Sequence, residues 1–197
     1  ALRFNLITGN SPGNDTRFYT EKCEAMRNFA NKIWNASRFV MMNLTIDHYT
    51  LPDADKLERE DKWVLSKLNR LVKEVTENLD SFEIGVASAK VYDFIWDTYC
   101  DWYIELTKTR LNGTDEAAKL AAQNVLCYVL VTLLKLLHPF MPFITEEIYQ
   151  ALPKCDGASD ILMMAQWPEY TEALNFPAEE NAMEAVMDLI RAIRARW

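Results

Sequence analysis

Glycine is scarce in this chain of 197 residues, which contains five. Globular proteins carry about 7% glycine, so the shortage argues against a turn-rich β-sandwich and favours long helices. Cysteine is sparse as well, because Cys23, Cys100, Cys127 and Cys155 lie far apart and form no CxxC pair. Isolated cysteines of this kind are typical of buried thiols in a reducing compartment and argue against a disulfide framework.

Histidine is nearly absent, which argues against the common metal and catalytic sites. His48 and His138 have no second histidine or cysteine at ligand spacing, so we expect no metal site. The chain also lacks GxGxxG, GxxxxGKS/T, GxSxG and HExxH, the signatures of nucleotide, nucleophile and zinc sites. At the end of an expected helix, His138 is more typical of a cap or a core residue. We therefore expect no catalytic residue and no bound cofactor in this chain.

Long hydrophobic runs and targeting signals are missing too. No stretch reaches eighteen apolar residues, because Thr132 and Lys135 interrupt the longest candidate, residues 125–137. We therefore expect no transmembrane helix. The chain starts with Ala-Leu-Arg-Phe, without an initiator Met or a signal peptide. This start indicates a piece of a larger protein, which we expect to be cytoplasmic.

Apolar periodicity, by contrast, extends over most of the chain. Half of the residues are hydrophobic, and the segments at helical spacing are bounded by turn and capping residues. Residues 1–14 are expected to be irregular, with a turn at 10–14. The expected helices span 20–44, 55–80, 82–111, 114–138 with Thr114 as its N-cap, 142–152 and 178–197. Short connections make neighbouring long helices antiparallel, so the sequence predicts an all-α, antiparallel helical bundle.

The bundle is expected to have a connector and a tail. Residues 153–177 carry three prolines and one glycine around the apolar run 161–164, which indicates a connector that crosses the bundle. The amphipathic tail helix is expected to lack a packing partner after about residue 181. The core is expected to collect these side chains: Met26, Phe29, Ile33, Val40, Trp63, Leu68, Val75, Trp96, Leu126, Leu130, Leu133 and Leu137.

Charge is distributed unevenly along the chain. The net charge is −8, yet residues 1–44 carry +3 and residues 45–197 carry −11. Only the N-terminal segment is therefore suited to phosphates. An acidic stripe recurs every four residues of the expected helix over 82–111: Asp93, Asp97, Asp101 and Glu105. No Glu-x-x-His pair accompanies it, so a solvated or arginine-paired helix face is favoured over a di-metal site.

The expected helix over residues 20–44 has two distinct sides at 100° per residue. Its core side carries Met26, Phe29, Ala30, Ile33, Ala36, Val40 and Leu44. A second side combines two guanidinium groups and two amides, with Trp34 at its edge: Arg27, Asn31, Asn35 and Arg38. In single-stranded RNA, such groups form hydrogen bonds with the edges of the bases, and aromatic rings or guanidinium planes stack on the base faces. The alternative is that these residues pair with the acidic stripe inside the bundle.

Several runs of residues identify a protein family more specifically than the helical spacing does. They are ALRF at 1–4, TGNSPGNDTRF at 8–18, RNFANKIWNASRF at 27–39, CDWYIE at 100–105, LHPFMPFITEE at 137–147 and QWP at 166–168. In this order they resemble the part of bacterial valyl-tRNA synthetases that follows the catalytic core, over essentially all 197 residues. The HPFMPF part is shared by the synthetases for valine, isoleucine and leucine. The runs SPGND and CDWYIE are far more specific to valine.

The resemblance implies the helical anticodon-binding domain of a class I aminoacyl-tRNA synthetase. Residues 1–18 would form a stem-contact segment, 19–152 the anticodon-binding bundle, 153–177 the connector and 178–197 a tail helix leading to a C-terminal arm. The helix over 20–44 would lie against the anticodon stem-loop of the tRNA for valine. Its first expected RNA contacts are Arg27, Asn31, Asn35 and Arg38. Two further candidates are Lys32 as a phosphate contact and Phe39 as a stacking ring.

The parent enzyme would join valine to its tRNA with ATP, through a valyl-adenylate. The HIGH and KMSKS signatures that the family uses for ATP are absent from this chain. The resemblance therefore implies a non-catalytic piece of a monomer, with the tRNA and the rest of its own synthetase chain as partners and no membrane. Two alternatives stay open here: the equivalent domain of an isoleucine or leucine enzyme, and a helical protein-interaction module.

Overall fold

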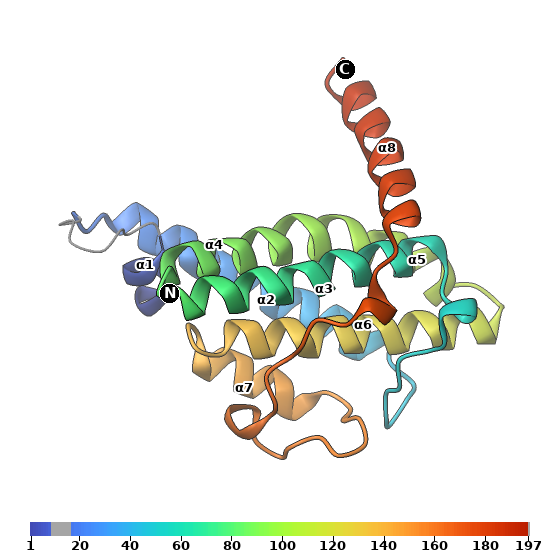
Figure 1. Ribbon diagram of the computed structural model, residues 1–197, viewed down its shortest axis with the longest axis horizontal. Helices are drawn as coiled ribbons and strands as arrows, with labels where there is room; N and C mark the ends of the chain where they lie inside the picture. Colours follow the sequence, from blue (N-terminus) through green and yellow to red (C-terminus); the bar gives the residue numbers. More distant parts are fainter. Residues whose placement is uncertain (9–16, 197) are drawn as a thin grey trace.

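The computed structural model describes residues 1–8 and 17–196, and these are predominantly helical (Figure 1). The α-helices are α1 (Leu2–Ile7), α2 (Thr20–Asn43), α3 (Arg59–Asp80), α4 (Ile84–Asp93), α5 (Ile104–Leu111), α6 (Glu116–Leu137), α7 (Pro142–Ala151) and α8 (Pro177–Arg194). A π-helical segment, η2 (Phe94–Tyr103), joins α4 to α5, and the 3₁₀ turns are η1 (Ala54–Lys56), η3 (Leu162–Met164) and η4 (Glu172–Leu174). The expected turn at 10–14 lies outside the described residues.

The long helices form the expected antiparallel bundle, with α6 at its centre. α3 packs against α4 and α6, while α2 packs against η2, α6 and α7. Figure 1 shows α7 and the connector beneath α6, and α8 rising away from the bundle. An isolated parallel bridge pairs His48 with Lys154 and ties the loop after α2 to the connector.

α6 is apolar over most of its surface because it lies inside the bundle. By length and composition it could cross a membrane, yet 83% of its most apolar window is buried within the protein. A helix that is hydrophobic all round is typical of a buried core. The predicted core is confirmed, with Met26 and Trp96 half-buried at its edge. Of the four free cysteines only Cys127 is buried, which corrects the expectation of four buried thiols.

The N-terminal segment differs from its expected irregular structure, because α1 is helical. Its sequence offers no side-chain cap, so a six-residue helix would be unstable alone. Phe4 supplies the missing stabilisation, since it is fully buried and its ring lies 5.5 Å from that of Phe29 and 6.3 Å from that of Phe140. Packing against distant residues therefore decides the structure of this segment.

Two helix starts lie further along the chain than expected. α3 begins at Arg59 rather than near residue 55, because Glu58 and Asp61 form a reciprocal capping box. The N-cap of α6 is Asp115 and not Thr114: Asp115 Oδ1 accepts hydrogen bonds from the N–H groups of Ala117 and Ala118 at 3.0 and 3.1 Å. A carboxylate at this end also interacts favourably with the helix dipole.

The predicted α-helix over residues 82–111 contains the π-helical segment η2 in its middle. Each π turn has an additional residue, which changes the direction in which the following side chains point. Tyr99 and Tyr103 are both buried here, and their hydroxyls donate to Leu126 O at 3.1 Å and Asp61 Oδ1 at 2.6 Å. These long-range bonds hold the wider turn in place.

The tail helix α8 has a packing partner over its first turns, contrary to expectation. Glu184 accepts hydrogen bonds from Lys67 Nζ at 2.6 Å and from Trp63 Nε1 at 3.1 Å, and Glu180 pairs with Arg70. Met187 is buried against the bundle. Other large apolar side chains of α8 are exposed: Val186, Leu189 and Ile193.

Candidate nucleic-acid interface

α2 presents a polar face to solvent because its apolar residues recur on the opposite side. Phe29, Ile33 and Val40 are buried in the core. The four residues predicted to contact RNA are all exposed: Arg27, Asn31, Asn35 and Arg38. Among the residues that the structure describes, no hydrogen bond or ion pair occupies these four side chains. Two guanidinium forks and two amides are thus available to an external ligand.

A groove of about 530 Å³ runs alongside this face, between α2 on one side and η2 and α5 on the other. The residues of α2 that line it include Asn28, Asn31, Lys32, Asn35 and Phe39. Cys100, Glu105 and Lys108 line the opposite wall. Four of the six predicted site residues therefore meet in one groove, while Arg27 and Arg38 lie outside its lining on the exposed face of α2.

Lys32 spans the groove and already has partners on the opposite wall. Its Nζ lies 2.7 Å from Asp101 Oδ1 and 3.7 Å from the centre of the Trp96 ring. An ammonium held between a carboxylate and an aromatic face gains ion-pair and cation–π stabilisation. A phosphate that approaches Lys32 would therefore compete with Asp101.

Phe39 and Lys108 form the other contact across the groove. Phe39 is half-buried, and Lys108 Nζ lies 5.5 Å from the centre of its ring. Lys108 also pairs with Glu105 at 2.6 Å, one turn earlier on the same wall. The exposed part of Phe39 offers an aromatic surface beside the amides of Asn31 and Asn35.

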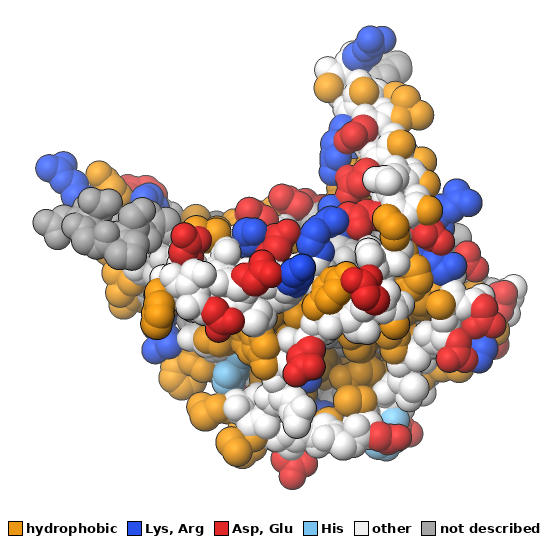
Figure 2. All heavy atoms as spheres, viewed as in Figure 1, with side chains coloured by type: hydrophobic (Ala, Val, Ile, Leu, Met, Phe, Trp, Pro, Cys, Tyr) orange, Lys and Arg blue, Asp and Glu red, His pale blue; other side chains and the backbone are white. Residues whose placement is uncertain are grey.

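The acidic stripe does not neutralise the arginines of α2. Asp101 pairs with Lys32 and Glu105 with Lys108, and Asp93 and Asp97 are exposed. The alternative in which the basic face pairs inside the bundle thus applies to Lys32 and not to Arg27 or Arg38. On the opposite side of the molecule, over α3 and α8, acidic and basic side chains alternate (Figure 2).

The groove offers polar contacts and no activated nucleophile. Burial raises the pKa of the Cys100 thiol to about 12, so this thiol is neutral near pH 7. His138 lies away from the groove at the end of α6, where its Nδ1 is 2.7 Å from Thr145 Oγ1. Burial lowers the pKa of His138, as suits a neutral capping residue. The arrangement suits recognition by hydrogen bonding, charge and stacking.

Sequence reasoning missed several residues of this surface. Asn28 lies on the same side of α2 as Asn31 and Asn35, so the helical periodicity that identified those two residues could also have identified Asn28. Met42 lies on the exposed face one turn after Arg38 and is 80% exposed. Lys108 comes from α5, and its place opposite Phe39 depends on tertiary packing alone.

Comparison with known proteins identifies related chains. Residues 61–196 match the protein family described as "Anticodon-binding domain of tRNA ligase". The valine–tRNA ligase of Clostridium acetobutylicum is 55% identical over 98% of this chain and 22% of that protein. Those of Clostridium perfringens and Carboxydothermus hydrogenoformans are 54% and 49% identical over the same shares. The chain thus spans about a fifth of the length of these relatives.

A solved structure supports the fold. It is the LeuRS of Agrobacterium radiobacter K84, crystallised in a ternary complex with tRNA and LeuAMS. Its TM-score is 0.65, with 20% sequence identity over 89% of this chain and 20% of that chain. At this identity the likeness concerns the fold alone.

Proposed function

Because this chain belongs to the family of anticodon-binding domains of tRNA ligases, we propose that its α2 face and groove bind the anticodon stem-loop of the tRNA for valine. The observation that carries the proposal is the set of exposed, unpaired side chains of Arg27, Asn31, Asn35 and Arg38 beside a groove. Single-stranded RNA loops are recognised by hydrogen bonds to base edges and by stacking on aromatic rings. The identities of 43–55% to valine–tRNA ligases favour valine over isoleucine or leucine.

Each side chain has a role that follows from its place. Arg27 and Arg38 lie on the open face, where guanidinium groups can bind phosphates or the edge of a guanine. The amides of Asn31 and Asn35 adjoin the groove and can pair with base edges, and Phe39 provides a stacking surface. Lys32 contacts a phosphate when Asp101 releases it.

The rest of the parent protein supplies the chemistry in this proposal. A catalytic domain outside this chain would use ATP to activate valine, and the present chain would position the tRNA. The parent acts as a monomer in the cytoplasm, without a membrane. The isolated chain is expected to show no valine-dependent exchange between ATP and pyrophosphate, because activation needs bound ATP and a positioned amino acid. Exchange that survives repurification and a control for host enzyme would contradict this.

A titration of the chain against the tRNA for valine and the tRNA for leucine, at two salt concentrations, tests the proposal. We expect tighter binding of the tRNA for valine, and a steep loss of affinity with salt. The logarithmic slope should be about −0.7 per phosphate contact on single strands. Equal affinity for both tRNAs would contradict specific recognition. Affinity that does not depend on salt would contradict phosphate contact and favour a protein partner instead.

A further inference from the structure

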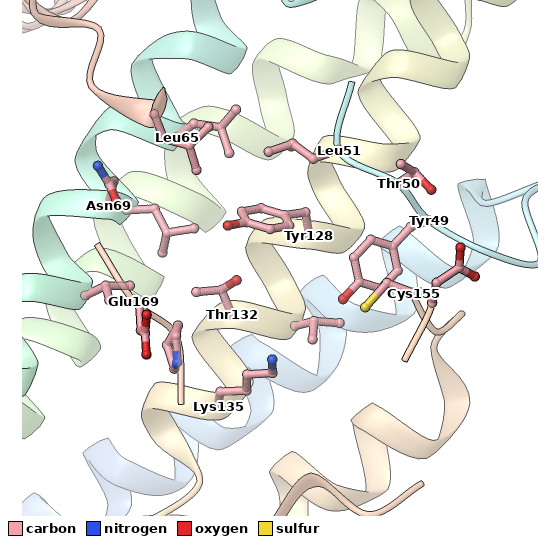
Figure 3. A pocket seen from close by; sticks show the side chains of 16 residues that line it. Tyr49, Thr50, Leu51, Leu65, Asn69, Tyr128, Thr132, Lys135, Cys155 and Glu169 are labelled. Atoms are coloured by element: carbon pink, nitrogen blue, oxygen red, sulfur yellow. The ribbon is translucent and has the colours of Figure 1, made fainter. Parts of the chain in front are cut away.

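A second cavity, of about 390 Å³, lies between α3, α6 and the connector (Figure 3). No residue of α2 lines it, so it is separate from the proposed RNA interface. Its walls are apolar where α3 and α6 face each other, at Leu65, Leu68 and Val131. Figure 3 shows Tyr128 at its centre, with Tyr49 and Cys155 on one side and Glu169 on the other. We call it the connector cavity.

The connector is held in place over this cavity by hydrogen bonds to α3. Asn69 Nδ2 donates to Thr171 O at 2.7 Å, and Thr171 N donates back to Asn69 Oδ1 at 2.9 Å. Trp167 Nε1 donates to Thr76 Oγ1 at 2.9 Å. The cavity therefore has defined walls on both sides, as pre-formed ligand sites do.

Lys135 is the feature that distinguishes the connector cavity from a packing defect. Its side chain is half-buried on α6, and its ammonium points toward the cavity (Figure 3). Within the described part of the chain it has no hydrogen bond and no ion pair, in contrast to Lys32, Lys67 and Lys90. Burial lowers its pKa, and this effect outweighs the opposing influence of the neighbouring Cys155. A partly desolvated cation without a partner is the group that an anion stabilises most.

We propose that the connector cavity binds a small monoanionic carboxylate with an apolar body, and that the carboxylate pairs with Lys135. The hydroxyl of Thr132, one turn before Lys135 on α6, also lines the cavity and can donate to the same carboxylate. The apolar body lies against the leucine and valine side chains of α3 and α6. This inference does not depend on the proposed binding of tRNA.

The charges around the cavity limit the ligand to a single negative charge. Asp156 and Glu169 line the cavity as well, and both are exposed. These two carboxylates would repel a phosphate ester or another dianion more strongly than a monoanion. One ammonium inside and two carboxylates at the exposed edge therefore favour a carboxylate ligand over a phosphorylated one.

Three compounds that share a ring and differ in charge test the ligand class: benzoate, benzamide and benzylamine. Each is titrated into the 197-residue chain up to about 10 mM, followed by saturation-transfer NMR. The rate at which iodoacetamide alkylates Cys155, which lines the cavity, locates the binding, with Cys23 on α2 as an internal reference. We expect benzoate to bind at least about tenfold more tightly than the other two, because only benzoate forms a charge-assisted hydrogen bond with Lys135. Benzoate should slow alkylation of Cys155 and not of Cys23.

The variant Lys135→Met removes the ammonium and keeps the length of the side chain. It should abolish the preference for benzoate. The control is Lys119→Met, which makes the same substitution at another half-buried position of α6 that does not line the cavity, and it should retain the preference. Three results would each overturn the proposal: no binding of benzoate, equal affinity for all three compounds or a preference for benzylamine, and a preference for benzoate that persists in Lys135→Met.

Discussion

Asp61 and Arg110 form a bidentate ion pair across the bundle, with Arg110 Nη1 donating to Asp61 Oδ2 at 2.7 Å and Nη2 donating to Oδ1 at 2.6 Å. The Asp61 side chain is fully buried, and its carboxylate also accepts hydrogen bonds from the Tyr103 hydroxyl and the Glu58 N–H. The pair therefore joins the first turn of α3 to the last turn of α5. It thereby anchors α5, which lines the groove, to α3.

The variant Asp61→Asn tests this connection. Loss of the carboxylate removes the bidentate partner of the buried Arg110 cation and leaves it only Glu60, whose Oε1 lies 3.2 Å from Nε. The free energy of unfolding should therefore fall by up to about 3–5 kcal/mol. Urea denaturation measures the change. The control is Asp53→Asn, whose side chain is 79% exposed and whose effect should stay within about 0.5 kcal/mol. A loss no larger than that of the control would show that the pair contributes little.

Arg27→Ala and Arg38→Ala test the open face of α2. A good bidentate contact is worth about 1–3 kcal/mol, so each variant should weaken use of the tRNA in the full-length ligase about 5- to 150-fold. Valine activation should remain nearly intact. Neither arginine has a partner within the described residues, so the melting temperature should not change. Normal charging of the tRNA by a stably folded Arg38→Ala enzyme would exclude RNA recognition at that position.

Asp101→Asn tests whether Lys32 is a phosphate contact. The change frees the Lys32 ammonium, so the affinity for the tRNA should rise about two- to fivefold at low salt. Asp93→Asn removes the same charge from the same stripe without touching Lys32, and it should have the smaller effect. Equal gains from the two variants would mean that only net charge matters and that Lys32 serves as a structural link.

Glu184 should make the docking of α8 dependent on pH. Burial alone would raise the pKa of Glu184, but hydrogen bonds from Lys67 and Trp63 outweigh it, so the pKa lies below its ordinary value of 4.5. A carboxyl group with a depressed pKa stabilises the folded state above the unfolded value, and this contribution is lost as the pH falls through the folded value. The side chain is 33% exposed, so the contribution should be below about 1 kcal/mol.

The variant Glu184→Gln measures this contribution. Its difference in free energy of unfolding from the wild type should be present at about pH 6 and should shrink as the pH falls below 4.5 and through the lower folded value. Glu147→Gln, an exposed position on α7, should show no such difference. A difference that stays constant across this range would mean that the charge of Glu184 does not stabilise α8.

Much of the fold was predictable from local signals. The period of 3.6 residues locates α2 to within a residue or so of its ends, and it separates Phe29 and Ile33 from Arg27 and Asn31. Pro142 marks the start of α7 for a similarly local reason, because its missing N–H suits the first turn. The prediction of Thr114 as the N-cap of α6 was wrong, because the adjacent Asp115 is of a residue type that caps helices equally well.

The sequence by itself determined that the chain is a helical bundle whose helix over residues 20–44 carries a basic, amide-rich face, because helical periodicity and charge depend only on residues near one another in the chain. The tertiary structure alone decided that α1 is helical, that η2 is a π-helix, and that Lys32 pairs with Asp101. It also decided that Lys135, at the connector cavity, has no hydrogen-bond or ion-pair partner among the residues that the structure describes. These features depend on which distant residues meet when the helices pack, and a local pattern carries no information about that meeting.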